Sequence, residues 1–194
     1  MIVDEVQAGM GRTGRLFAIE HWGVMPDIIT LAKGIASGLP LGAILARPEL
    51  MNWPPGSHAT TFGGNPVACA AANVTLRLLE SSLIDNARRM GELLQVGLFQ
   101  FQSLKEIQGA KRVSIPRGKG LMVAIDVFDR AGNLDPELRD HIINQAFLRG
   151  LLLLGCGKAA IRFCPPLVID SDQIQVALEI LFQSLIDVHT PIRS

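Results

Sequence analysis

Three short apolar runs near the start of the chain constrain its fold more than any other feature of the sequence. Residues 1–5 form the first, and DIITLA (27–32) and LGAILA (41–46) are the others, each bounded by Gly or Pro. Short runs that stay apolar without alternation are typical of strands buried on both faces. We therefore expect an α/β fold whose mainly parallel sheet has helices on both sides.

Helical periodicity begins at Asn65. Apolar residues recur there at i, i+3, i+4 and i+7, which predicts an amphipathic helix, and a second helix follows it. The predicted packing faces are Val67, Ala70, Ala71, Val74 and Leu78 in the first helix and Ala87, Met90, Leu94, Leu98 and Phe101 in the second.

The remainder of the chain predicts a smaller α+β domain. The basic stretch 109–120, with Lys111, Arg112, Arg117 and Lys119, is interpreted as a solvated loop or lobe boundary, with anion binding as the alternative. After it we expect a strand in GLMVAIDVF, a helix capped by Asp135 with Pro136 at its first position, short strands in LLLLG and AAIRFCPPL, and a last helix from about Ser171. The expected domains are residues 1–80, part of a large domain, and 81–194, a connecting helix and a small C-terminal domain.

Composition restricts the class of protein and of partner. The 194 residues are 48% apolar, enough for a globular core, and no apolar run is long enough to span a bilayer. Lys+Arg and Asp+Glu both total 18, so no net field attracts nucleic acid or a membrane surface. Three cysteines without a C-x-x-C pair favour reduced thiols and a cytoplasmic protein, and four scattered histidines lack metal-ligand spacing, so no metal site is expected.

The segment Gly9-Met10-Gly11-Arg12-Thr13-Gly14 matches G-x-G-x-x-G, the pattern of a dinucleotide-binding turn. The match is interpreted as accidental. Asp4 and Glu5 would place negative charge beside a diphosphate, and the following RLFAIEHWGV is too short for a crossover helix before Gly23.

Two ionisable residues each stand directly after an apolar run. Lys33 lies in TLAKGIASG without an acidic neighbour, and an amine in apolar surroundings becomes a nucleophile toward carbonyls. Taken alone, Lys33 fits better a side chain that extends from a strand end into solvent, and Asp4 fits a carboxylate that caps the glycine loop.

Three motifs in this order and spacing carry a resemblance to a known family. DEVQAGMGRTG, the lysine of PDIITLAKG, and SHATTFGGNPVACAAA together resemble the class III aminotransferases, with GLLLLGCG and IRFCPPLVI continuing the match toward the C-terminus. These are pyridoxal phosphate (PLP) enzymes of fold type I, among them the 4-aminobutyrate, ornithine and acetylornithine aminotransferases.

The resemblance implies a role for each matching residue. Lys33 would form the Schiff base with PLP and move protons during transamination, and Asp4 would pair with the pyridine nitrogen and keep it protonated. Val6 would pack on the ring face, and Gln7 would hydrogen-bond the phenolic oxygen. Thr61 would reach the PLP phosphate of the neighbouring subunit, because the family builds its sites across a homodimer interface.

The resemblance also implies a substrate class. Arg162 matches a position at which many members bind a substrate carboxylate, which suits its planar fork. The expected reaction transfers an amino group from a 4-aminobutyrate- or ornithine-like donor to a 2-oxo acid such as 2-oxoglutarate.

The family's chains are roughly twice as long, and the sequence corresponds to their C-terminal half, so we expect a truncated chain. Two alternatives stay open. One is a remnant without catalysis, and the other is a PLP-dependent racemase or aminomutase, because these share the scaffold.

Overall fold

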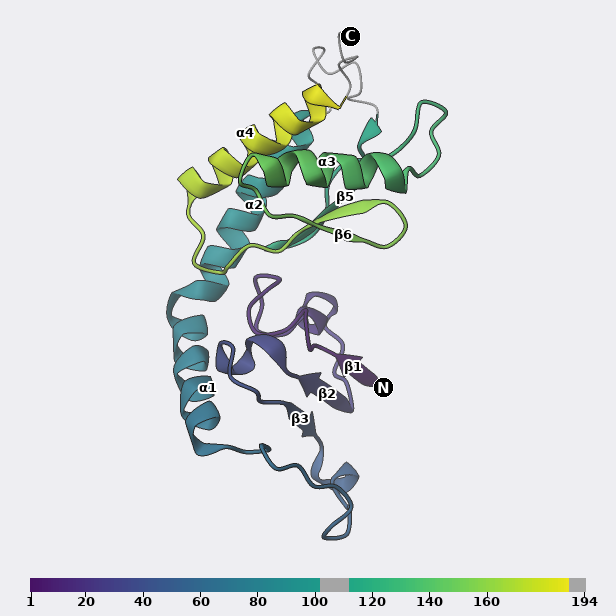
Figure 1. Cartoon of the computed structure of the whole chain (residues 1–194). Helices are drawn as coiled ribbons and strands as arrows, with labels where there is room; N and C mark the ends of the chain where they lie inside the picture. The colour runs from purple at the N-terminus through teal and green to yellow at the C-terminus, as the bar shows by residue number, and fades with distance from the viewer. Residues whose placement is uncertain (102–111, 189–194) are drawn as a thin grey trace. The chain divides into compact units, whose positions relative to one another are not determined.

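The computed structural model describes residues 1–101 and 112–188. They divide into two compact units, Met1–Ala87 and Arg88–Ser194, and each is described by itself (Figure 1). The division falls within a helix, α2 (Ile84–Gln100), and not within a loop. The expected boundary at residue 80 between a large and a small domain stays a prediction.

A mixed three-stranded sheet forms the first unit's framework. Strand β2 is central, with β1 parallel to it on one side and β3 antiparallel on the other. The strands are β1 (Ile2–Asp4), β2 (Ile28–Leu31) and β3 (Ala43–Ala46). Short 3-10 helices lie at Ala18–Trp22, Lys33–Ala36 and Pro48–Leu50. All three apolar runs are therefore strands, as predicted.

The expected α/β fold class is confirmed, and within the described chain helices leave part of this sheet uncovered. Leu31 is buried, but Ile2, Ile44 and Leu45 are exposed. The physical reason is that α1 (Pro66–Leu78), the long helix within this unit, packs chiefly against the 3-10 helix Lys33–Ala36 and covers little of the strands.

Helix α1 starts where the sequence predicts. The Asn65 side chain accepts hydrogen bonds from the backbone N–H groups of Val67 and Ala68, and Pro66 occupies the first helical position. Its predicted packing face, however, is wrong within this unit. Val67, Val74 and Leu78 are exposed.

The buried face of α1 is instead made of small residues. Ala68, Ala72 and Thr75 are buried. Small side chains let another backbone approach the helix closely, and the helix Lys33–Ala36 occupies that side. The spacing of apolar residues cannot predict this small-residue face. It identifies large apolar side chains and contains no information on how closely a neighbouring backbone approaches the helix.

Helix α1 continues into α2 through a wider π-helical turn at Leu79–Leu83. By length and composition the continuous helix Pro66–Gln100 could cross a membrane, a test that core helices of soluble proteins also pass. Within α2, Ala87, Leu94 and Leu98 are buried, as predicted, and so is Phe101 just beyond it.

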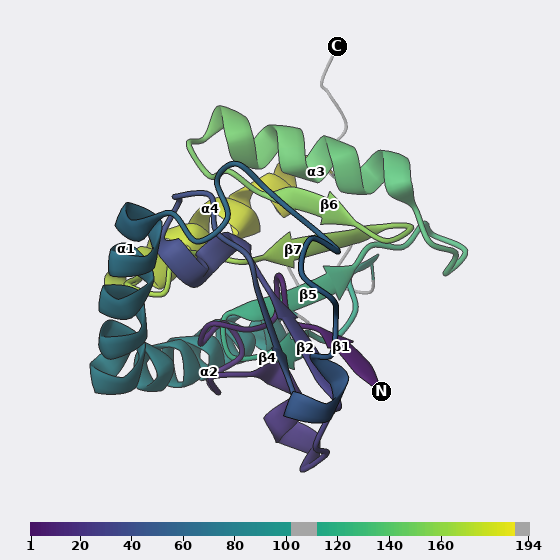
Figure 2. The ribbon, with the colours of Figure 1, turned by 90° about the horizontal axis from the view of Figure 1, so that it is seen from below.

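The second unit contains a four-stranded antiparallel sheet of order β4-β5-β7-β6, which can be followed in Figure 2. Its strands are β4 (Arg117–Lys119), β5 (Met122–Asp126), β6 (Leu154–Cys156) and β7 (Ala160–Phe163).

Two local expectations in this unit need correction. Part of the predicted loop 109–120 is strand β4, because its backbone pairs with β5 in a hairpin, a partner that local composition does not reveal. Strand β6 begins at Leu154 and not at Leu151, because its ladder to β7 starts at the Leu154–Arg162 pair.

Helices α3 (Pro136–Leu148) and α4 (Ser171–Asp187) complete the second unit. Asp135 caps α3 by accepting from Leu138 N–H, as predicted, and Asp170 caps α4 by accepting from Gln173 N–H. Core residues from both helices, from α2 and from the sheet form one apolar cluster that includes Leu98, Ile125, Ile142, Ile161, Ile174 and Leu181.

Candidate active site

The candidate site lies where two parallel strands end. In the ladder between β1 and β2, Asp4 stands opposite Thr30. The carboxyl ends of parallel strands meet at one edge of a sheet, so Asp4 and the turn that begins at Lys33 share that edge. The topology thus brings together residues that are 29 positions apart in the sequence.

The amine of Lys33 is held by an amide at this edge. Lys33 Nζ donates a hydrogen bond of 2.9 Å to Gln7 Oε1. Gln7 is half-buried, whereas Lys33 is exposed. The lysine that was singled out as a nucleophile is therefore directed toward one of the residues expected to contact a cofactor.

Asp4 and Val6 are joined by a local hydrogen bond. Asp4 Oδ1 accepts from the backbone N–H of Val6 at 2.9 Å. This bond closes a tight turn at the end of β1 and fixes the carboxylate beside the chain segment that leads to Gln7. Four of the six predicted site residues thus gather at one edge of the sheet: Asp4, Val6, Gln7 and Lys33.

The backbone of Lys33 adopts an uncommon conformation. Its φ of +45° lies in the left-handed region, as does the φ of +55° of Met10. The two segments meet, since a Cβ on Gly34 would lie 3.7 Å from Met10 Cβ. The buried side chains of Ile35 and Ala36 anchor the turn that places Lys33 at the edge.

Glu5 is a residue of the site region that the sequence reasoning missed. Its side chain is 1% exposed, and its carboxylate oxygens accept from the backbone N–H groups of Ala18 and Ile19 at 3.1 and 2.8 Å. A carboxylate at the first turn of a helix satisfies N–H groups that lack partners within the helix. The signal was an acidic residue inside an apolar strand end, between two candidate cofactor residues.

The glycine loop folds back on Glu5. Gly9 N–H donates to Glu5 O, and a Cβ on Gly9 would lie only 2.8 Å from that oxygen, so no larger residue fits without a shift. The next helical element is the five-residue 3-10 helix Ala18–Trp22. A βαβ dinucleotide site requires a long helix directly after the loop, and this geometry does not supply one.

Thr61 lies apart from this cluster. It is exposed in the segment that leads to α1, four residues before the helix cap Asn65. Within residues 1–101 and 112–188, no hydrogen bond joins Thr61 to Asp4, Gln7 or Lys33.

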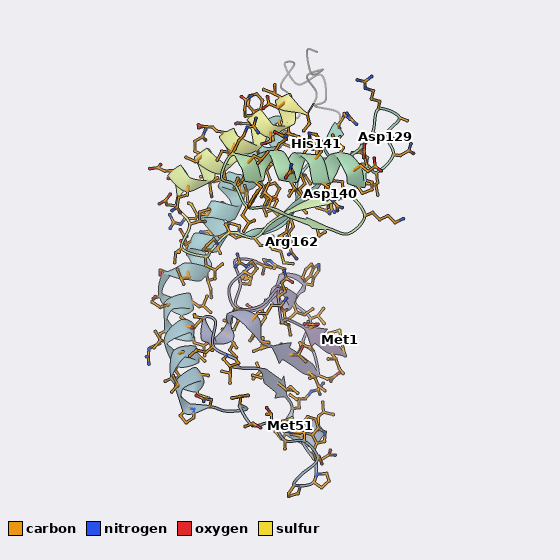
Figure 3. The ribbon with its side chains drawn as sticks, in the orientation of Figure 1. Met1, Met51, Asp129, Asp140, His141 and Arg162 are labelled. Atoms are coloured by element: carbon orange, nitrogen blue, oxygen red, sulfur yellow. The ribbon has the colours of Figure 1, made fainter. Side chains whose placement is uncertain are left out.

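Arg162 belongs to the second unit, where it lies on β7 (Figure 3). Its neighbours along the strand, Ile161 and Phe163, belong to the apolar core, and alternation puts Arg162 on the opposite face. The residue is half-buried. Its Nε is buried and has no hydrogen-bond partner among the described residues.

Arg162 lines a cavity of about 520 Å³. Most of the lining is apolar, including Leu151, Leu153, Phe163 and Ile174. A guanidinium with a buried, unpartnered N–H in such surroundings favours an anion with planar geometry.

Two arginines of the basic stretch 109–120 are paired with carboxylates, and anion binding by the stretch stays an open alternative. Arg112 pairs with Asp135 at 3.4 Å, and Arg117 forms two hydrogen bonds with Asp126. Lys111 lies outside the described residues.

Comparison with known proteins gives one consistent result. The family model for aminotransferase class-III matches residues 1–185. The acetylornithine aminotransferase of Caldanaerobacter subterraneus subsp. tengcongensis is 41% identical over 181 residues, which cover 93% of this chain and 43% of that protein. The 4-aminobutyrate aminotransferase of Mycobacterium leprae is 42% identical over 191 residues, which cover 96% of this chain and 42% of that protein.

Solved structures agree. The ornithine aminotransferase of Toxoplasma gondii, which has partial occupancy of PLP at its active site, matches with a TM-score of 0.83 and 34% identity over 96% of this chain and 43% of that chain. A phospholyase from Arthrobacter in complex with phosphoethanolamine matches with a TM-score of 0.84 and 30% identity over 95% of this chain and 44% of that chain. This chain thus spans less than half the length of the relatives it matches, and over residues 1–185 it belongs to the class III aminotransferases.

Proposed function

We propose that this chain carries the lysine-bearing part of a PLP-dependent aminotransferase, which moves an amino group from an amino acid to a 2-oxo acid. The observation that carries the proposal is the meeting of Lys33 Nζ and Gln7 Oε1 at the sheet edge where Asp4 ends β1. The supporting context is the family membership of residues 1–185.

The donor set at this edge fits PLP chemically. An amine can react with the aldehyde of the cofactor, a carboxylate can pair with its ring nitrogen, and an amide can hydrogen-bond its phenolic oxygen. Lys33, Asp4 and Gln7 supply these three groups, and the half-buried Val6 supplies an apolar side chain for the ring face.

Each of these residues has a distinct task in the proposed mechanism. Bound PLP supplies an electron sink for a carbanion at the substrate carbon. Asp4 would pair with the pyridine nitrogen of bound PLP and would favour its protonated form, because a negative charge beside that nitrogen stabilises the proton. Lys33 would hold PLP through its amine, and the free amine would move a proton between carbon atoms of the substrate.

Arg162 is proposed to bind the substrate carboxylate. Its buried Nε without a partner supports this role, because a charge-assisted bidentate contact would satisfy it. The donor class is then a carboxylated amine such as 4-aminobutyrate, ornithine or an α-amino acid, with a 2-oxo acid such as 2-oxoglutarate as acceptor.

Thr61 is proposed to contact the PLP phosphate of a neighbouring copy, which implies a homodimer with shared sites. Its exposure and its place just before the N-terminus of α1 support this, since helix starts favour phosphate. We further propose a cytoplasmic location. Cys69, Cys156 and Cys164 form no disulfide within the described part of the chain, which suits a reducing compartment.

A second candidate is another PLP reaction on the same scaffold. The specific observation is the structural match to a phospholyase, which shows that the shared fold is not confined to transamination. Elimination, racemisation and transamination share the removal of a proton from the substrate, so Lys33 and Asp4 would keep their tasks and the products would differ.

The test begins with cofactor binding by the purified chain. With PLP, the wild-type chain should develop a visible absorbance band, and Lys33→Ala should abolish it. Lys158→Ala is the matched control, because Lys158 is an exposed lysine in the second unit. An absorbance band of equal intensity in Lys33→Ala and in the wild type would contradict the assignment of Lys33.

Product identification then separates the reactions. Incubation with 4-aminobutyrate, ornithine or a chiral α-amino acid, each with 2-oxoglutarate, should yield glutamate. Racemised amino acid without glutamate supports a racemase, and release of inorganic phosphate from phosphoethanolamine supports a lyase. PLP binding without any product supports an inactive remnant.

A further inference from the structure

The 3-10 helix that carries Lys33 ends at a residue with strained backbone. Ser37 has a φ of +50°, in the left-handed region that glycine adopts without cost and a serine does not. Its N–H donates to Gly34 O and closes the turn. A strained residue that persists is held there by its surroundings, which raises the question of what the Ser37 side chain contributes.

The side chain of Ser37 reaches helix α1. Its Oγ lies 2.8 Å from Thr75 Oγ1, and Thr75 is 9% exposed. Thr75 Oγ1 also donates to Ala71 O at 3.0 Å. A hydroxyl has one proton, so Ser37 is the donor and Thr75 the acceptor in the bond between them.

This bond fixes the orientation of a contact between two helices. The helix Lys33–Ala36 contacts α1, and its residues Ile35 and Ala36 are buried. Apolar packing tolerates small rotations of the turn, whereas a hydrogen bond between two hydroxyls requires one orientation. Thr75 is also one of the few buried polar residues of the first unit. Loss of Ser37 as a hydrogen-bond donor would therefore leave the buried Thr75 hydroxyl with one hydrogen bond fewer.

We propose that the Ser37–Thr75 pair positions Lys33. The hydrogen bond holds the strained turn against α1, and the amine of Lys33 therefore stays at the sheet edge beside Gln7 and Asp4. Ser37 and Thr75 act through the backbone of the turn, so they are positioning residues. The functional consequence of positioning Lys33 rests on the proposed function. The claim that the Ser37–Thr75 hydrogen bond holds the turn against α1 does not depend on it.

Two substitutions separate the hydroxyl from the backbone. Ser37→Gly relieves the left-handed strain and removes the hydroxyl of Ser37. Thr75→Val removes the hydroxyl that accepts from Ser37 and donates to Ala71 O, and it keeps the side-chain shape. If the backbone alone mattered, Ser37→Gly would be neutral or stabilising. Thr75→Ser restores a hydroxyl at position 75 and is the rescue variant. Ser81→Ala removes an exposed hydroxyl that bonds Leu78 O and is the matched control.

The first measurement is amide hydrogen exchange, which needs no cofactor. Ile35 N–H and Leu39 N–H, which bond Ala32 O and Ala36 O, report on the turn. We expect exchange about three- to tenfold faster in Ser37→Gly and in Thr75→Val, the range for loss of one hydrogen bond. The double variant should exchange no faster than either single variant, and Thr75→Ser and Ser81→Ala should match the wild type.

The second measurement is the pH midpoint of the visible absorbance of the PLP-loaded protein. It should move in Ser37→Gly and Thr75→Val and return in Thr75→Ser, which a loss of general stability would not produce. Unchanged exchange in Ser37→Gly, or additive effects in the double variant, would overturn the inference. So would faster exchange without a moved midpoint in a protein that binds PLP.

The two proposals fail separately. Absence of any visible band in the wild type with PLP contradicts the proposed function. In that case the exchange rates of the turn still decide whether the Ser37–Thr75 bond holds it. Faster amide exchange at Ile35 and Leu39 that is not additive in the double variant supports the inference that the bond holds the turn. The absence of this effect overturns the inference.

Discussion

Lys33 Nζ donates to Gln7 Oε1 at 2.9 Å, and 26 positions separate the two residues in the chain. Neither side chain lies within a strand, since Gln7 follows β1 and Lys33 follows β2. The parallel pairing of those strands places both residues at one edge of the sheet. The Lys33–Gln7 contact therefore depends on the parallel pairing of β1 and β2 and is evidence for that pairing.

Gln7→Ala should weaken PLP binding without unfolding the chain. The substitution removes the hydrogen-bond acceptor of Lys33 and the proposed donor to the cofactor, so we expect affinity to fall about three- to thirtyfold, the effect of one or two such bonds. Titration of the visible band gives the affinity. The control is Gln175→Ala, which removes an exposed glutamine that bonds Glu179 on α4. Equal affinities of Gln7→Ala and the wild type would remove Gln7 from the site.

Glu5→Ala should destabilise the first unit far more than Glu20→Ala. Glu5 is buried and accepts hydrogen bonds from two backbone N–H groups. Glu20 is exposed and accepts one from the N–H of Phe17. Leaving two half-buried N–H groups unpaired beneath the buried Glu5 position should cost about 2–4 kcal/mol, against less than about 1 kcal/mol at the exposed site. Urea unfolding measures both. Similar losses in the two variants would show that burial of Glu5 contributes nothing specific.

Gly91→Ala and Gly97→Ala form a matched pair on α2. Both gain about 1 kcal/mol of helix propensity. A Cβ at position 91 would lie 2.1 Å from the backbone oxygen of Gly120, whereas at position 97 it would meet the end of the Leu178 side chain at 2.2 Å. A flexible side chain can move and a backbone cannot, so we expect Gly91→Ala to lower the thermal midpoint clearly more. The reverse order would contradict the close approach of Gly120 to α2.

The turn at Asp129 should respond to acid. Its carboxylate accepts from the backbone N–H groups of Asn133 and Ala131, with the Asn133 contact first in importance, and this lowers the pKa of Asp129 below the ordinary value of 3.8. A lowered pKa means that the turn is stabilised above pH 3.8 and loses this contribution as the pH falls through the folded-state pKa. Carboxyl chemical shifts give the midpoint. A midpoint at or above the ordinary value would contradict the hydrogen bonds.

The sequence by itself predicted most of the local elements and named the candidate site residues. Asp135-Pro136 marked a helix start because a capping side chain and proline act within one turn, and apolar spacing placed the start of α1 near Asn65. The apolar spacing of α2 identified a face that is buried, with Leu94 and Leu98 among its residues. Family motifs named Asp4, Gln7 and Lys33 through residue types and spacing alone.

Only the tertiary structure decided which of these residues meet and which faces are covered. Parallel pairing of β1 with β2 brings Gln7 to Lys33, and close packing of the turn Lys33–Ala36 buries Thr75 while Val74 stays exposed. Glu5 became a buried helix cap because residues 18 and 19 fold back to it. The physical reason is the same in each case: caps and periodicity depend on neighbours within a few residues, whereas burial and pairing depend on partners that are distant in the chain.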